Sequence, residues 1–227
     1  ENLRRESIMG DIFITGNTAI DAMRYTVRPD YKFSTAILNE LDFTHHRVLA
    51  VTCHRRENYG EPMQNIMHAI LRLVEENPDV EVVYPVHLSP VVRECAFPIL
   101  GNHPRIHLID PIDVEEMHNL MARCFFVLTD SGGLQEEAPA LGKPVLVMRR
   151  ETERPEAIAA GTAKLVGVEQ ETILREANEL LHSEEAYAKM AKAVNPYGDG
   201  HASERIVQAI LWHFGRTADR PGDFCAQ

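Results

Sequence analysis

A glycine-rich turn between an apolar run and a helical segment is the stretch of this sequence best suited to chemistry. The apolar run at 125–128 is typical of a buried strand in a parallel sheet, and the pattern becomes helical from Leu134. Between them, Ser131, Gly132 and Gly133 leave backbone N–H groups free where the helix dipole favours an anion. A tight turn without any ligand is the commoner meaning of such glycines. The sequence therefore predicts a strand–turn–helix unit whose first turn is a candidate phosphate site.

Other polar side chains follow the ends of predicted strands. His54 and Arg55 come directly after the apolar run at 47–52, His87 follows the run at 80–84, and Asp110 follows the run at 106–109. Open α/β sheets bind ligands at the carboxyl ends of their strands, so we expect these side chains to lie near the glycine turn. A solvated basic turn is the alternative for His54 and Arg55, with Arg55 paired to an acid such as Glu57.

Two further charged residues are candidates for ligand contact. Glu137 lies one turn beyond the glycines, where its carboxylate can accept hydrogen bonds from sugar hydroxyls. Glu136 points about 100° away from it on a helix, so only one of the two can face the ligand. Arg154 closes a charged stretch at 149–154, and such a stretch is more often a solvated surface loop.

Strands and helices alternate along the chain, which predicts an α/β fold with a doubly wound, Rossmann-like parallel sheet. The expected strands are 11–16, 47–52, 80–84, 106–109, 125–128, 145–148 and 163–166. The expected helices are the end of one within 1–10, then 18–25, 35–41, 63–76, 90–100, 113–123, 134–142, 170–181, 184–193 and 202–214.

Composition excludes several classes of protein. The 227 residues carry a net charge of −11, which argues against binding the phosphates of nucleic acid, so an anionic ligand must be held by local donors. The four cysteines are scattered without the spacing of a metal site, a usage that suits a reducing cytoplasm. Cys53 and Cys124 are expected in the core. We expect no membrane span, no metal and no nicotinamide cofactor.

One long motif resembles a known family. DSGGLQEEAPALGKPVLVMRRETERPEA, at 130–157, is similar to the signature of the non-hydrolysing UDP-N-acetylglucosamine 2-epimerases. Those enzymes share the two-domain GT-B architecture with many glycosyltransferases. Four other segments agree with the family in its order, and they are TGNTAIDA at 15–22, VTCHRREN at 51–58, YPVHLSP at 84–90 and NPYGDGHAS at 195–203. The resemblance covers nearly the whole chain up to its tail.

The resemblance implies a UDP-binding C-terminal domain. The family interconverts UDP-N-acetylglucosamine and UDP-N-acetylmannosamine by eliminating UDP and adding it back, and it needs no cofactor. Residues 1–26 would be the end of an N-terminal domain and a linker, 27–200 the UDP-binding domain, 201–215 a crossover helix and 216–227 a disordered tail. The N-terminal domain, which carries the acid and base carboxylates, would be missing. We therefore expect this chain alone to bind UDP without turnover, and the full-length enzyme to be a homodimer.

The resemblance also assigns roles to residues. The histidine matching His54 lies in the active site near the diphosphate, which implies phosphate contact and a supporting part in proton transfer. Arg55 and His87 match UDP-contacting positions that, in bacterial members, take part in a second, regulatory UDP-N-acetylglucosamine site.

The motif around the glycine turn carries the remaining roles. Ser131, Gly132 and Gly133 match the diphosphate cradle, and Glu137 resembles the carboxylate that holds the ribose hydroxyls. Arg154 matches an arginine near the nucleotide.

Three alternatives remain open. A GT-B glycosyltransferase would use a similar donor cradle, a hydrolysing relative would release free N-acetylmannosamine, and a non-catalytic nucleotide-sugar-binding module would perform no chemistry. The helix at 202–214 would pack on the N-terminal domain in this architecture. Without that domain, we expect the apolar residues Leu211 and Phe214 to be exposed or buried in a contact between copies.

Overall fold

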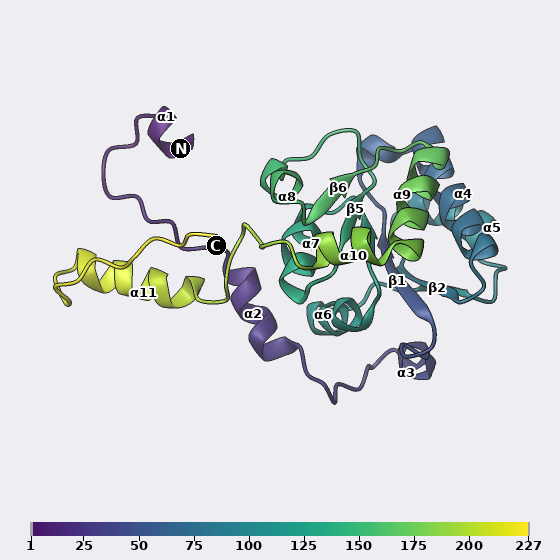
Figure 1. Cartoon of the computed structure of the whole chain (residues 1–227), viewed down its shortest axis with the longest axis horizontal. Helices are drawn as coiled ribbons and strands as arrows, with labels where there is room; N and C mark the ends of the chain where they lie inside the picture. Colours follow the sequence, from purple (N-terminus) through teal and green to yellow (C-terminus); the bar gives the residue numbers. More distant parts are fainter. Residues whose placement is uncertain (1, 227) are drawn as a thin grey trace.

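The computed structural model describes residues 2–226 and contains one parallel sheet in that range (Figure 1). Its six strands are arranged in the order β3-β2-β1-β4-β5-β6, and each adjacent pair runs parallel. The strands are β1 Arg47–Thr52, β2 Val80–Pro85, β3 Ile106–Ile109, β4 Val127–Thr129, β5 Val145–Val147 and β6 Ala163–Leu165. The strand order reverses between β1 and β4, and the crevice at such a reversal is the usual ligand site of a doubly wound sheet.

Helices cover both faces of the sheet because the central strands are apolar on both sides. In β1, Leu49 and Val51 belong to one core, whereas Val48 and Ala50 belong to the other. The first face packs against α4 Glu61–Glu76, α5 Pro90–Leu100, α9 Gln170–His182 and α10 Glu184–Ala191. The second packs against α3 Ala36–Glu40, α6 Val114–Arg123, α7 Gly132–Glu137, η2 Ala138–Leu141 and α8 Pro155–Ala160. Cys53 and Cys124 are buried in these cores, as predicted.

Most predicted elements are confirmed, with boundaries shifted by a few residues. The predicted strand at 11–16 is wrong, because no strand of the sheet lies beside it and its backbone runs irregularly next to the tail. The predicted strand at 125–128 is β4, two residues later, although Phe125 N–H still donates to Val48 O. The helix expected from Leu134 starts at Gly132 and ends as the 3-10 helix η2, where Gly142 adopts φ +67°.

The last helix, α11 Ala202–His213, lies apart from the sheet with the N-terminal segment beside it (Figure 1). Phe13 packs edge-on against Trp212, and Phe224 N–H donates to Ile14 O, so the irregular segment 216–226 runs along residues 12–14. Leu211 and Phe214 are 38% and 71% exposed, which confirms the expected exposure of this helix.

Three further elements complete the described chain, and they are α1 Asn2–Arg5, α2 Thr18–Thr26 and η1 Arg56–Asn58. Glu1 and Gln227, the outermost residues of the predicted N-terminal helix and of the predicted tail, lie outside the described residues. Between residues 2 and 226, no helix is long and apolar enough to cross a membrane. The same residues contain no group of three or more His, Cys, Asp or Glu side chains that could hold a metal ion.

Candidate functional site

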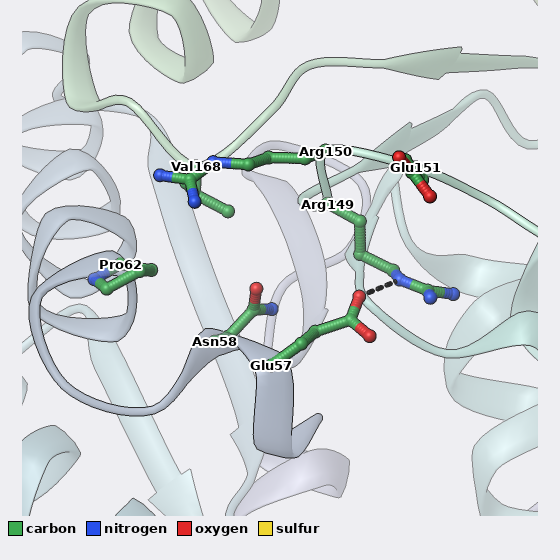
Figure 2. Close-up of a pocket in the computed structure, with 7 residues that line it drawn as sticks. All are labelled: Glu57, Asn58, Pro62, Arg149, Arg150, Glu151 and Val168. Atoms are coloured by element: carbon green, nitrogen blue, oxygen red, sulfur yellow. Dashed lines mark hydrogen bonds and ion pairs between the residues drawn. The ribbon is translucent and has the colours of Figure 1, made fainter.

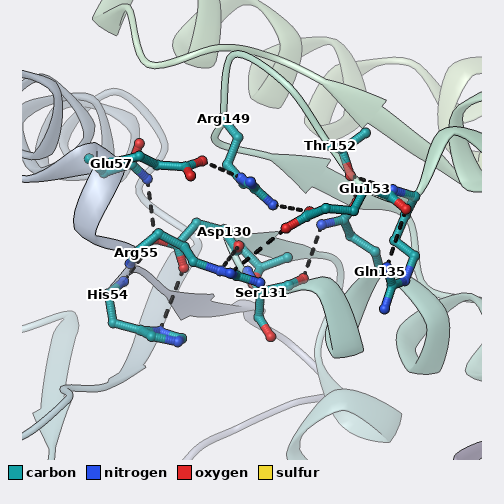
Figure 3. A network of polar contacts seen from close by, with 12 residues as sticks. His54, Arg55, Glu57, Asp130, Ser131, Gln135, Arg149, Thr152 and Glu153 are labelled. Carbon is teal, nitrogen blue, oxygen red and sulfur yellow. Dashed lines mark hydrogen bonds and ion pairs between the residues drawn. The ribbon is translucent and has the colours of Figure 1, made fainter.

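Asp130 joins the loops that leave β1 and β4 at the point where the strand order reverses. Its side chain is fully buried, and Oδ2 accepts hydrogen bonds from the backbone N–H groups of His54 and Arg55, at 2.8 and 2.7 Å (Figure 3). Asn58 Nδ2 is a third donor at 3.2 Å. The other oxygen, Oδ1, has no hydrogen-bond partner and lies 3.6 Å from His54 Nδ1. One carboxylate therefore fixes the β1 loop against the β4 loop and turns one ring nitrogen of His54 inward.

His54 and His87 lie together at this edge. Their rings stack with centroids 5.4 Å apart and planes 11° from parallel. His87 Nδ1 accepts a hydrogen bond from Ser89 N–H, at 3.0 Å, which fixes the orientation of that ring. Because His54 Nδ1 faces Asp130, its Nε2 is the nitrogen left for a ligand.

The glycine turn lies beneath two guanidinium groups. A Cβ on Gly132 would lie 3.6 Å from Arg55 Nη2 and 3.8 Å from Arg154 Nη2. Neither Gly132 nor Gly133 has a positive φ, and a Cβ on either would meet its neighbours at ordinary van der Waals distances, so a side chain here would be limited only by what occupies the space above the turn. Ser131 caps α7 without a side-chain hydrogen bond to the helix. The first turn of α7 thus faces the guanidinium groups of Arg55 and Arg154. A side chain on Gly132 would reduce the space between the turn and these two groups.

Adjacent carboxylates on α7 face different partners, as the helical spacing predicts. Glu136 is buried and bonds to Arg154 Nε and to Asn17 Nδ2. The hydrogen bond to Glu136 raises the pKa of Arg154 above its ordinary value. Glu137 points the other way, so that its Oε1 would lie 3.6 Å from a Cβ on Gly133. Glu136 thus anchors the arginine, and Glu137 remains beside the glycine turn.

Arg149 braces the loop that carries Arg154. It is only 5% exposed and bonds to Glu57 and Glu153, which come from the β1 loop and its own loop (Figures 2 and 3). Burial lowers the pKa of Arg149, but the hydrogen bonds to Glu153 and Glu57 outweigh it and raise the pKa overall. The same contact lowers the pKa of Glu153 to about 2.

A surface-loop interpretation of 149–154 is therefore wrong for Arg149, because its guanidinium lies inside the protein. Figure 2 shows the adjoining pocket of about 250 Å³, which is lined by Glu57, Asn58, Pro62, Arg149, Arg150, Glu151 and Val168.

The structure brings the predicted residues to one edge of the sheet. Arg55 does not pair with Glu57. Its Nη1 lies 3.8 Å from Glu153 Oε1, and its Nε donates to Asp130 O at 3.3 Å. Asp110 follows β3 at the same edge but pairs with Arg93 of α5 at the surface.

Sequence reasoning missed three contributors, which are the Asp130 carboxylate, Asn58 and Arg149, and it also missed the buried His118, whose Nε2 lies 3.6 Å from Glu137 Oε2. Asn58 and Asp130 lie in the family motifs at 51–58 and 130–157, and Asp130 also directly follows β4, so a polar residue at a strand end was an available signal for it. Nothing local marks His118, which looks like one more polar residue on an amphipathic helix.

Comparison with known proteins agrees with this geometry. Residues 1–211 match the sequence profile of the family described as UDP-N-acetylglucosamine 2-epimerase. The Bacillus subtilis UDP-N-acetylglucosamine 2-epimerase is 52% identical over 225 residues, covering 99% of this chain and 58% of the relative. The structure of S. aureus MnaA with UDP superimposes with a TM-score of 0.91 at 47% identity, covering 98% of this chain and 60% of that one.

The Neisseria meningitidis UDP-GlcNAc 2-epimerase bound to UDP-GlcNAc gives a TM-score of 0.84 at 43% identity, over 93% of this chain and 58% of that one. This chain thus spans about three fifths of the length of these relatives. The glycine turn, the strand order and the matched profile together place the chain in the UDP-N-acetylglucosamine 2-epimerase family.

Proposed function

We propose that this chain is the UDP-binding, C-terminal half of an enzyme that interconverts UDP-N-acetylglucosamine and UDP-N-acetylmannosamine. The observation that carries the proposal is the position of Gly132, at the start of α7 and beneath the guanidinium groups of Arg55 and Arg154. Relatives were solved with UDP and with UDP-GlcNAc, which supports a uridine nucleotide as the ligand.

The diphosphate would lie on the first turn of α7. There the N–H groups of Gly132 and Gly133 donate to its oxygens while Arg55 and Arg154 neutralise its charge. This local arrangement is needed because the chain as a whole carries a net charge of −11. Glu137, beside the turn, would accept hydrogen bonds from the ribose hydroxyls.

His54 would act where the sugar leaves the diphosphate. Elimination of UDP breaks the bond between the sugar C1 and the phosphate oxygen, and the departing oxygen gains negative charge. His54 Nε2 and the two arginines would stabilise that charge, which lowers the barrier to departure and to re-addition. Asp130 would keep the imidazole in the orientation that presents Nε2, since it faces Nδ1.

The carboxylates that move the proton at the sugar C2 would come from an N-terminal half of the enzyme. The exposed apolar residues Ile210 and Phe214, at the end of α11, support such a partner, because they line a groove of about 450 Å³ together with Phe13. His87 would contribute to the second, regulatory nucleotide site, and the full-length enzyme would be a homodimer, as the resemblance implies.

Titration calorimetry with UDP tests the proposal. The chain should bind UDP, and Gly132→Ala should weaken binding about 100-fold, or about 2.7 kcal/mol, because the methyl group occupies the phosphate space. Gly161→Ala is the matched control, since Gly161 has φ +78° and no atom within 4 Å of its Cβ position. That variant should lose about 1 kcal/mol of stability and retain its UDP affinity.

Two results would contradict the proposal. The first is equal UDP affinity of the Gly132→Ala variant and the unmodified chain. The second is rapid epimerisation of UDP-GlcNAc by this chain alone, followed by NMR, because it would place the proton-transfer carboxylates within these residues. Transfer of the sugar to an acceptor would point to a glycosyltransferase instead.

A further inference from the structure

A buried histidine lies behind the carboxylate of Glu137. His118, on α6, is 2% exposed, and its Nδ1 lies 2.7 Å from Thr26 Oγ1 at the end of α2. Its Nε2 is buried without a hydrogen-bond partner and lies 3.6 Å from Glu137 Oε2. An unpartnered polar atom in the interior is costly, so one that points at a site residue indicates a role there.

The contacts of the His118 ring indicate which ring nitrogen carries the proton. Thr26 Oγ1 lies closer to His118 Nδ1, at 2.7 Å, than to Ala22 O, at 3.3 Å. The hydroxyl can therefore donate its proton to Nδ1. With Nδ1 as the acceptor, the ring proton lies on Nε2, which faces Glu137 Oε2.

The backbone on both sides of this contact is held in place. Asn119, the next residue on α6, accepts a hydrogen bond from Arg28 N–H at 3.0 Å and donates to Thr26 O at 2.7 Å. At the other end of α2, Asn17 bonds to Glu136. Helix α2 thus contacts Glu136 directly and reaches Glu137 through His118.

We propose that His118 is a positioning residue that orients the Glu137 carboxylate toward the ribose of a uridine nucleotide. It does not touch the ligand, because its ring is enclosed between α2 and α7. The Glu137 side chain is 21% exposed, so a fixed donor behind it reduces the side-chain entropy lost when it binds two hydroxyls. The inference rests on the proposed function, since it assumes that Glu137 binds a ribose.

A histidine that only stabilises packing between α2 and α6 is the competing explanation. Such a residue would change the free energy of unfolding, but it would not change the discrimination between ligands with and without ribose hydroxyls. Ligand discrimination is therefore the deciding measurement.

Two substitutions at residue 118 separate the two ring nitrogens. His118→Asn places an amide near the Nδ1 position and keeps the Thr26 contact, whereas His118→Gln reaches the Nε2 position and the Glu137 contact. The probes are UDP, 2′,3′-dideoxy-UDP and inorganic pyrophosphate, measured by calorimetry on the full chain. Circular dichroism and thermal unfolding verify the fold of each variant.

We expect His118→Asn to weaken UDP binding about tenfold, roughly the effect of one lost hydrogen bond, and to leave pyrophosphate binding within twofold. Its preference for UDP over the dideoxy analogue should fall by the same factor, and His118→Gln should retain most of that preference. In the Glu137→Gln background, His118→Asn should have no further effect, because the residue it positions is already changed.

Three outcomes decide the matter. Unchanged discrimination in the His118→Asn variant, or an equal loss of UDP and pyrophosphate binding, overturns the inference while the proposed function stands. Failure of the unmodified chain to bind UDP overturns the proposed function and this inference with it. If His118→Asn does not fold, Thr26→Val replaces it, since it keeps the ring and removes the hydroxyl that hydrogen-bonds to Nδ1. A loss of discrimination of about threefold would then support the inference, and none would overturn it.

Discussion

The two ends of the parallel sheet both contain buried charged groups, but these groups differ in how many of their polar atoms have hydrogen-bond partners. At the amino end, Glu81 bonds to His46 through one oxygen and to His107, at 2.7 Å, through the other. At the carboxyl end, Asp130 has one oxygen with three donors and one with none, and His118 Nε2 is also without a partner. These are two of the four buried side-chain atoms that lack a partner in residues 2–226.

The difference separates a structural cluster from a binding site. Buried polar groups that only stabilise a fold are normally paired, since an unpaired buried polar group destabilises the folded state. The unpaired Asp130 Oδ1 and His118 Nε2 instead face His54 and Glu137, two residues that are proposed to contact the ligand. The identity of the donors matters as well, because a histidine can lose its charge when its partner is removed, whereas a backbone N–H cannot.

The largest effect is expected from removing the Asp130 carboxylate. Asp130→Ala leaves two backbone N–H groups without their acceptor and removes one of the two acceptors of the Asn58 amide, in a fully buried site. We expect a loss of about 3–5 kcal/mol in the free energy of unfolding, measured with urea, together with loss of UDP binding.

The same change at the amino end serves as the comparison. Glu81→Ala should cost only about 1 kcal/mol, since the His46 side chain is 42% exposed and can hydrogen-bond to solvent instead. Asp130→Asn, which keeps one accepting oxygen, should recover most of the stability lost in Asp130→Ala. Equal losses at the two ends would refute the distinction between them.

An intermediate effect is expected at the anchor of Arg154. Glu136→Gln removes the charge that holds the guanidinium beside Gly132, so we expect UDP affinity to fall about tenfold. Calorimetry measures the change. Glu151→Gln removes the same charge from an exposed position in the neighbouring loop and should leave affinity within twofold. A drop of similar size in both variants would show that net charge, and not the anchor, is responsible.

The sequence was sufficient for the sheet and for the residues at its carboxyl edge. Strand runs such as 47–52 and 106–109 were predicted at their observed bounds because a parallel sheet buried on both faces requires continuous apolar runs. The strand expected at 11–16 failed because an apolar pattern does not reveal whether a neighbouring strand is present.

The residues that hold the site were harder to predict than the residues that form it. Arg149 reads as part of a charged loop, and only the fold shows that Glu57, 92 positions away, encloses it. His118 lies 92 positions from Thr26, so no local pattern could connect the two. Contacts between segments that are distant in sequence decide which polar residues become buried. Short sequence motifs do not reveal these contacts.

The smallest effect is a pH dependence that belongs to the amino end alone. The hydrogen bond to Glu81 raises the pKa of His46 above its ordinary value of 6.5. For Glu81, burial raises the pKa, but the hydrogen bonds from His46 and His107 outweigh it and lower the pKa below 4.5. The stabilisation from His46 is therefore complete below 6.5 and is lost as the pH rises through the folded pKa, whereas that from Glu81 is lost only as the pH falls below 4.5.

The cluster should thus stabilise the protein most between these two values. The difference in unfolding free energy between the unmodified chain and His46→Asn should be largest near about pH 5.5 and should shrink by about pH 9. Urea titrations at the two pH values measure it. His45→Asn is the matched control, because His45 neighbours His46 but pairs with Asp42 at the surface, away from Glu81. If the difference in unfolding free energy for His46→Asn instead grows with pH, Glu81 is not held by a charged His46. The amino end of the sheet would then not be the end whose buried charges are fully paired.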